Sequence, residues 1–355
     1  MIRSALLLCG AILIATALAC APAVAPPPTF TVNTLDCSSP ATFAASIQRL
    51  GAKFDPSPGP LGNSPTSDDP VTNPSIIADL TNAFALAPPR FRKHLCGGDG
   101  NPGVAVFVQD CPASTACVVG SWGYRKRSTG ERFIALSAGL WQTVGIGSAL
   151  PYTNFETAVL ANLLVATDVR YQSASNNRPE MTVLAALAHE MGHILLWDSM
   201  GWTVPRSCPK PHPGLPDRFW EISWRNPAAP PTPFHGFGDE FPGAMRKNPL
   251  DKDQIRQEVL AGHMGVARNE LRQIYGGEWA SLLANVAPDE DLIESYKLLI
   301  LNTANNVGAG PLTSLTIDIP SQQQPPPPAP DVIRQSLTSG TPLFDKRRWV
   351  DACLP

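Results

Sequence analysis

The sequence has 355 residues, of which 43% are hydrophobic and 38 are proline. A chain of this length can bury a substantial core, as one large domain or two lobes, and so many prolines predict long irregular connections. The formal net charge of −3 gives no electrostatic reason to expect nucleic acid as a partner.

Residues 1–19 have the pattern of a secretory signal peptide. Arg3 supplies a positive charge before the apolar run "ALLLCGAILIATALA", which is shorter than a transmembrane helix requires. The end of this run, "TALAC", resembles the lipobox of bacterial lipoproteins, and the resemblance implies that Cys20 is lipidated. Ordinary cleavage after Ala19 is the alternative. We therefore expect an exported bacterial protein, either a periplasmic or outer-membrane lipoprotein that meets the membrane only through its lipid, or a secreted protein.

Six cysteines remain after the signal peptide and Cys20 are set aside, and an even set in an exported chain predicts three disulfide bonds. These six are Cys37, Cys96, Cys111, Cys117, Cys208 and Cys353. The sequence does not choose among most pairings. Cys111 with Cys117 is our preferred pair, because this bond would close a hairpin between two strands, and Cys353 is expected to attach the C-terminal segment to the body.

Residues 20–75 are rich in proline and predict a spacer with at most one short helix, near residues 41–51. A folded domain is expected over residues 76–305, interrupted by a long proline-rich excursion at residues 203–250. Residues 306–355 predict a proline-rich C-terminal arm of the polyproline type.

Within the folded domain, β-propensity and turn residues predict strands in residues 101–111, 116–126 and 130–141. Helical spacing of apolar residues predicts helices over residues 154–172, 181–198, 251–275 and 277–301.

The stretch "LAALAHEMGHILLWD", residues 184–198, places two histidines and a glutamate in an otherwise apolar helix. Residues four apart share a helix face, so His189 and His193 can hold one metal ion. Glu190 lies about 100° further around the helix, where it can reach a water on the open side of the metal. This H-E-x-x-H pattern resembles the zincin metallopeptidases. The resemblance implies one zinc ion, a peptide or protein substrate, and Glu190 as the general base toward a zinc-activated water.

Two histidines need a third ligand to complete a catalytic zinc site. The extended pattern that ends in a third histidine fails, because Leu196 and Ser199 stand at the positions of its glycine and histidine. A glutamate from a later helix is then the expected ligand. Glu294, in "APDEDLIESYKLLIL", lies in an apolar stripe where a carboxylate is costly unless it binds something.

The segment "PDEDLIESY" resembles the P-x-E-D-x-x-E-x-[FY] segment of a group of bacterial proteins assigned as zinc-dependent metallopeptidases, related to the catalytic domain of anthrax lethal factor. The resemblance implies that Glu294 is the third zinc ligand. It also implies a gluzincin-type, zincin-like α+β fold: a small mixed or antiparallel sheet, an active-site helix and a mainly helical C-terminal subdomain. Lethal factor carries an oxyanion-stabilising tyrosine seven residues before this glutamate, and this chain has Ala287 there.

Other residues around these motifs have expected roles. Glu290 and Asp291 precede Glu294 by four and three residues, which makes them candidates to hydrogen-bond a ligand imidazole. Glu221, inside the excursion, is the alternative third ligand. His94 is expected to be a surface or capping residue, and the tyrosine two positions after Glu294 is expected to pack in the core.

The rival hypothesis is a catalytically silent, zinc-binding scaffold lipoprotein of the same fold. An intact Glu190 argues against it, because a structural site needs no base at that position.

Overall fold

The computed structural model describes about two thirds of the chain, and the structural statements below concern these residues alone. They are residues 35–51, 69–98, 103–111, 117–125, 130–141, 147–164, 170–173, 177–200, 213–225, 245–247, 251–306, 314–318, 331–334 and 339–354. The signal peptide, Cys20, Cys208 and most of the proline-rich excursion lie outside them. Within these ranges, no helix has both the length and the apolar character needed to cross a membrane.

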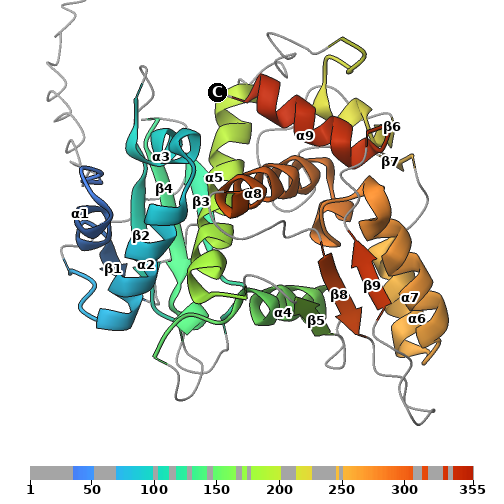
Figure 1. Cartoon of the computed structure of the whole chain (residues 1–355), viewed down its shortest axis with the longest axis horizontal. Coiled ribbons are helices and arrows are strands. Elements are labelled where there is room, and N and C mark those ends of the chain that lie inside the picture. The colour runs from blue at the N-terminus through green and yellow to red at the C-terminus, as the bar shows by residue number, and fades with distance from the viewer. Residues whose placement is uncertain are drawn as a thin grey trace, which may run out of the picture. The chain divides into compact units, whose positions relative to one another are not determined.

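Helices make up most of the described chain, and strands form three small sheets (Figure 1). The α-helices are α1 (Pro40–Ala45), α2 (Pro74–Leu86), α3 (Pro89–Cys96), α4 (Tyr152–Leu164), α5 (Pro179–Met200), α6 (Lys252–Leu260), α7 (Met264–Gln273), α8 (Pro288–Asn306) and α9 (Pro342–Cys353). The strands are β1 (Gln48–Leu50), β2 (Ala105–Gln109), β3 (Trp122–Arg125), β4 (Arg132–Ser137), β5 (Arg170–Ser173), β6 (Trp224–Arg225), β7 (Met245–Arg246), β8 (Ser314–Asp318) and β9 (Asp331–Arg334). Short helical turns are η2 (Ala138–Trp141), η3 (Phe219–Glu221), η4 (Ile274–Glu278) and η5 (Leu283–Asn285).

The largest sheet has the strand order β1-β2-β4-β3 and is mixed. β1, β2 and β4 are parallel, and β3 runs antiparallel to β4 at the edge. Alternate residues of β2 and β4 face two different cores: Val106 and Ile134 face the main core, whereas Phe107 and Phe133 face a smaller one. The predicted α+β class with a small mixed sheet is confirmed, as are the three predicted strands. In the expected spacer, the short helix predicted near residues 41–51 is present as α1, and β1 follows it as a fourth strand of the sheet.

α5 and α8 are the two central helices, and they pack against each other (Figure 1). The prediction of a helix over residues 181–198 is confirmed by α5, whose residues 181–188 are all buried. A helix that is apolar on every side must be packed against other elements on every side. α5 packs against α2, α8 and the sheet. α5 therefore carries its polar residues into the interior of the protein.

Three predicted helices have different ends in the structure. The helix expected over residues 154–172 ends at Leu164, and residues 170–173 form β5. Residues 251–275 contain two helices, because Gly262 adopts a φ of 75° that ends α6. The last predicted helix begins at Pro288, since proline favours the first turn of a helix.

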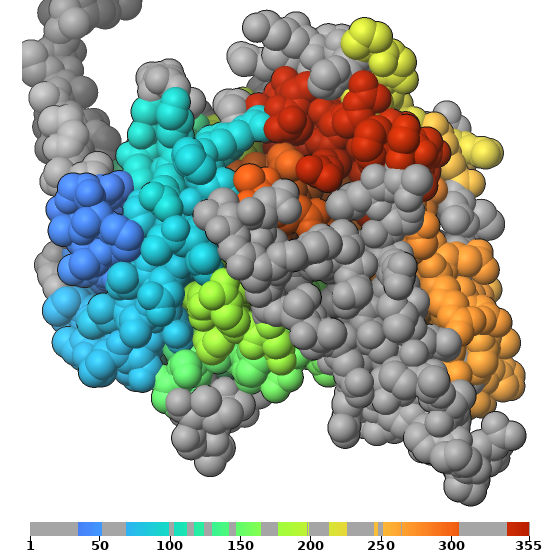
Figure 2. All heavy atoms as spheres, viewed as in Figure 1, coloured from blue at the N-terminus to red at the C-terminus, as the bar shows by residue number. Residues whose placement is uncertain are grey.

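The prediction of a polyproline-type arm is wrong for the end of the chain, where residues 342–353 form α9. Thr341 caps this helix by accepting a hydrogen bond from the Phe344 backbone N–H, and Pro342 stands at its first position. The helix buries Leu343 and Val350 against the body of the protein. In the space-filling view, α9 forms the molecular surface next to the visible part of α8 (Figure 2).

Disulfide bonds connect several of these elements. The predicted bond between Cys111 and Cys117 is confirmed, and a second bond joins Cys37 to Cys96. Cys353 is also disulfide-bonded, so the end of α9 is covalently tied to another part of the chain.

Candidate metal centre

α5 brings the donor atoms of His189, Glu190 and His193 to within 4.8 Å of one another, so that this group could hold a metal ion. The two imidazole rings are one helical turn apart, with their centroids separated by 5.1 Å. Their side chains are 16% and 17% exposed, whereas Glu190 is 5% exposed. The histidines therefore lie at the boundary between the core and solvent, where a bound metal could keep an open position.

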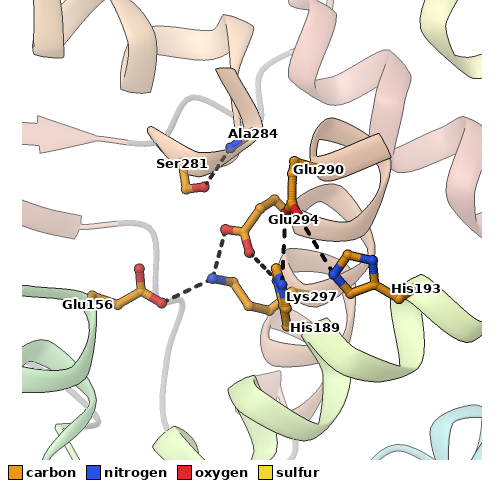
Figure 3. A network of polar contacts seen from close by, with 8 residues as sticks. All are labelled: Glu156, His189, His193, Ser281, Ala284, Glu290, Glu294 and Lys297. Atoms are coloured by element: carbon orange, nitrogen blue, oxygen red, sulfur yellow. Dashed lines mark hydrogen bonds and ion pairs between the residues drawn. The ribbon is translucent and has the colours of Figure 1, made fainter. Parts of the chain in front are cut away.

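Glu290, on α8, faces both histidines (Figure 3). Its Oε2 lies 3.8 Å from Nε2 of His189, and its Oε1 lies 3.7 Å from Nε2 of His193. These separations are too long for hydrogen bonds. Two donors on one tetrahedral zinc ion, each at about 2.0–2.2 Å, lie roughly 3.4 Å apart. Each separation between a Glu290 oxygen and an Nε2 atom is thus close to that between two ligands of one ion.

The carboxylate of Glu290 is in an unusual environment for a charged group. Its side chain is 0% exposed, and among the described residues neither of its oxygens has a hydrogen-bond partner. Burial raises the pKa of Glu290 well above its usual range. A buried carboxylate without hydrogen bonds is costly unless a cation binds it.

Glu294 lies one turn further along α8 and contacts the opposite side of the His189 ring. Its Oε1 lies 2.8 Å from Nδ1 of His189, and its Oε2 lies 2.7 Å from Nζ of Lys297. Burial opposes ionisation of Glu294, but the charge of Lys297 and the hydrogen bond from His189 outweigh it and lower the pKa of that carboxyl. Glu294 is therefore an anion that accepts a hydrogen bond from Nδ1–H. This contact leaves Nε2 of His189 to face Glu290.

The sequence-based assignment gave Glu294 the role of ligand and Glu290 the role of partner to an imidazole. The geometry favours the exchange of these two roles, because Glu290 faces Nε2 of both histidines and Glu294 faces Nδ1 of one. A carboxylate that accepts from the second ring nitrogen of a metal-binding histidine fixes its tautomer and orientation.

The other predicted site residues lie in different surroundings. Asp291 accepts a hydrogen bond from Trp224 Nε1 at 3.0 Å and pairs with Lys346, so its carboxylate contacts these two side chains and not the imidazole of His189 or His193. Glu221, the alternative ligand, lies on η3 with a side chain that is 45% exposed.

The expectation for His94 is wrong, because its side chain is buried and its Nδ1 lies 2.6 Å from the hydroxyl of Tyr296. The α3 helix packs its apolar face inward and carries His94 with it. Tyr296 is fully buried, as predicted for a core residue.

Glu190 contacts the edge strand β3. The backbone N–H of Gly123 donates a hydrogen bond to the Glu190 carboxylate, and burial raises the pKa of this carboxyl to about 7. A β-carbon on Gly123 would lie 2.6 Å from the Glu190 backbone oxygen, so only glycine allows β3 and α5 to approach this closely. The strand thereby orients the Glu190 carboxylate.

Sequence reasoning missed the charged residues behind the centre, Lys297 and Glu156. Lys297 pairs with Glu156 of α4 at 3.1 Å as well as with Glu294. One available signal was the spacing of Glu294 and Lys297, three residues apart on a helix and within an otherwise apolar stripe. No comparable signal connects Glu156 to this site, since the contact depends on how α4 packs.

The balance of charge in this cluster also favours a cation. The cluster contains one buried lysine, Lys297, which contacts two of its carboxyl groups. The four buried carboxyl groups are Glu156, Glu190, Glu290 and Glu294. A divalent cation would favour the ionised form of Glu290, whose pKa is raised by burial. Neutral imidazole and carboxylate donors form a ligand set that suits zinc.

Comparison with known proteins gave no match for this chain among protein-family models, curated proteins or solved structures.

Proposed function

We propose that the protein is an exported, zinc-dependent metallopeptidase with a zincin-like catalytic domain. The observation that carries this proposal is the position of Glu290, a buried carboxylate without hydrogen bonds that faces Nε2 of both His189 and His193. We assign these three residues as the zinc ligands. Glu294 orients His189 in this proposal and takes the role first considered for Glu290.

The reaction assigned to the centre is hydrolysis of a peptide bond. A bound zinc ion would supply Lewis acidity and lower the pKa of a bound water. Glu190 accepts a proton from the attacking water through its carboxylate and returns that proton to the leaving amine. Its raised pKa is close to neutral, which suits a group that both takes and gives a proton. The hydrogen bond from Gly123 holds the carboxylate in one orientation while it does so.

The neighbouring strand supports a peptide as the substrate class. β3 is an edge strand among the described strands, and its residue Gly123 lies against Glu190. An extended peptide can pair with an exposed strand edge through main-chain hydrogen bonds. Such pairing beside β3 would bring a scissile peptide bond near the Glu190 carboxylate.

Export is supported by the disulfide bonds at Cys37–Cys96 and Cys111–Cys117, since such bonds persist in oxidising compartments. Lipidation of Cys20 remains a separate part of the proposal. It predicts that the full-length protein partitions into detergent and that Cys20→Ser releases it.

The test compares zinc content and peptide hydrolysis in the wild-type protein and in Glu190→Gln. The wild type should bind one zinc ion and cleave members of a diverse peptide library. Glu190→Gln should keep the zinc and lose hydrolysis by orders of magnitude, because only the base is removed. Zinc binding without any cleavage by the wild type would favour the scaffold hypothesis. A wild type that binds no zinc would refute both.

A further inference from the structure

A buried lysine and a buried glutamate lie behind the metal centre without facing it. Lys297 Nζ lies 2.7 Å from Glu294 Oε2 and 3.1 Å from Glu156 Oε1, and Figure 3 shows the resulting chain from Glu156 through Lys297 and Glu294 to His189. The side chains of Lys297 and Glu156 are 8% and 5% exposed. Glu156 in turn accepts a hydrogen bond from Tyr152, which fixes its position on α4.

The buried ion pair between Lys297 and Glu156 is not explained by a contribution to stability. Removing two charges from water costs several kcal/mol for each ion, and a well-packed apolar pair at the same positions is often as stable or more stable. A role in positioning is a better explanation, because Lys297 also contacts Glu294, whose other oxygen contacts a proposed zinc ligand.

We propose that Lys297, held by Glu156, is a positioning residue that keeps Glu294 on Nδ1 of His189 and away from the metal. This inference rests on the proposed function. Lys297 occupies Oε2 of Glu294 while His189 occupies Oε1, so neither oxygen is available to turn toward the Nε2 side of the ring. Glu290, which has no such partner, is left as the carboxylate that binds the ion. The Lys297–Glu156 pair thus determines which of the two glutamates on α8, Glu290 or Glu294, is the zinc ligand.

The test measures zinc affinity by competition with a chelator, in full-length protein whose folding is confirmed by circular dichroism. Lys297→Met should weaken zinc binding about 10- to 100-fold, the usual effect of losing an outer partner of a metal ligand. Glu156→Gln should weaken it less, because the amide oxygen can still accept from Lys297. This milder variant also keeps the test decisive if Lys297→Met fails to fold.

Lys346→Met is the matched control. Lys346 is a second buried lysine that pairs with α8, at Asp291, but within the described residues neither side chain forms a hydrogen bond or ion pair with His189 or His193. The Lys346→Met variant should be less stable than the wild type but bind zinc with wild-type affinity. A general destabilisation of α8 would instead weaken zinc binding in both lysine variants.

A double-mutant cycle shows whether Lys297 acts through Glu294. In a Glu294→Ala background there is no carboxylate to hold, so Lys297→Met should cause little further loss of zinc affinity. Wild-type affinity in Lys297→Met, or a full additional loss in the double variant, would overturn the inference. A wild type that binds no zinc would instead refute the proposed function, so the two failures are distinguishable.

Discussion

Gly192 of α5 lies directly against Ile293 of α8. A β-carbon built on Gly192 would lie 3.0 Å from Ile293 Cγ2 and 3.2 Å from its Cα, closer than real side chains normally approach. Gly192 stands between the two histidines in the chain, and Ile293 stands between the two glutamates. This close contact between the helices therefore lies within the metal centre, and it limits the distance between the donors on α5 and those on α8.

Gly192→Ala should move α5 and α8 apart by a few tenths of an ångström and weaken zinc binding. The expected loss is about tenfold, comparable to the loss of an outer partner of a ligand, because the ligands are displaced but none is removed. Gly265→Ala, on α7, is the control, since a β-carbon there would meet no atom within 4 Å. That control should bind zinc like the wild type and gain about 0.5–1 kcal/mol of stability. Equal zinc affinity in both variants would show that the helix spacing does not matter.

The identity of the third ligand can be tested by alanine substitution of the two glutamates. Glu290→Ala should lose zinc more completely than Glu294→Ala, since the first removes a proposed ligand and the second removes the partner of His189 Nδ1. Losing the partner should cost about 10- to 100-fold in affinity. Glu221→Ala should have no effect on zinc content, because this side chain is exposed on η3. The opposite order for Glu290 and Glu294 would restore the assignment made from the sequence.

Lys346→Met should destabilise the fold by about 3–5 kcal/mol, because it leaves Asp291 buried without its ion-pair partner. Lys346 also donates to the Glu278 backbone oxygen at 2.7 Å and lies over the Trp279 ring, so α9 is attached to α8 and η4 through one side chain. Urea unfolding measures the loss. Adding Asp291→Asn to Lys346→Met should recover part of it, since the uncompensated charge is then removed.

Asp79 of α2 should make stability depend on pH. Its Oδ2 accepts hydrogen bonds from Trp141 Nε1 and from the Ala149 backbone N–H, and burial raises its pKa above the model-peptide value of 3.8. A carboxyl with a raised folded-state pKa favours the folded state while it is protonated. That contribution is present below the unfolded pKa and is lost as the pH rises through the folded pKa.

Asp79→Asn keeps an oxygen acceptor and cannot ionise, so its stability relative to the wild type should increase from pH 4 toward pH 7. Asp79→Ala leaves two buried donors unsatisfied and should cost about 1–3 kcal/mol for each. Thermal unfolding at several pH values measures both effects. A constant difference between Asp79→Asn and the wild type across this range would show that Asp79 is not the source of the dependence.

Local spacing along the chain was sufficient to predict the part of the centre that lies on α5. His189, Glu190 and His193 are within one helical turn, so the helix period alone places them together, and the apolar residues around them predict that this helix is buried. The three strands and the Cys111–Cys117 bond were also predictable, because alternation and short separation are local properties.

The tertiary structure was needed to assign the role of any site residue that acts through a contact with a different helix. Glu290 and Glu294 are four residues apart and share one face of α8, so their spacing cannot show which faces Nε2 and which faces Nδ1 of His189. That choice depends on how α8 packs against α5 at Gly192. Glu156 lies 141 residues before Lys297, so only the packing of α4 against α5 and η5 brings the two side chains together. The sequence by itself thus determined which helix presents the histidines and the base, since that follows from local periodicity, and only the packing of distant helices decided which carboxylate faces them.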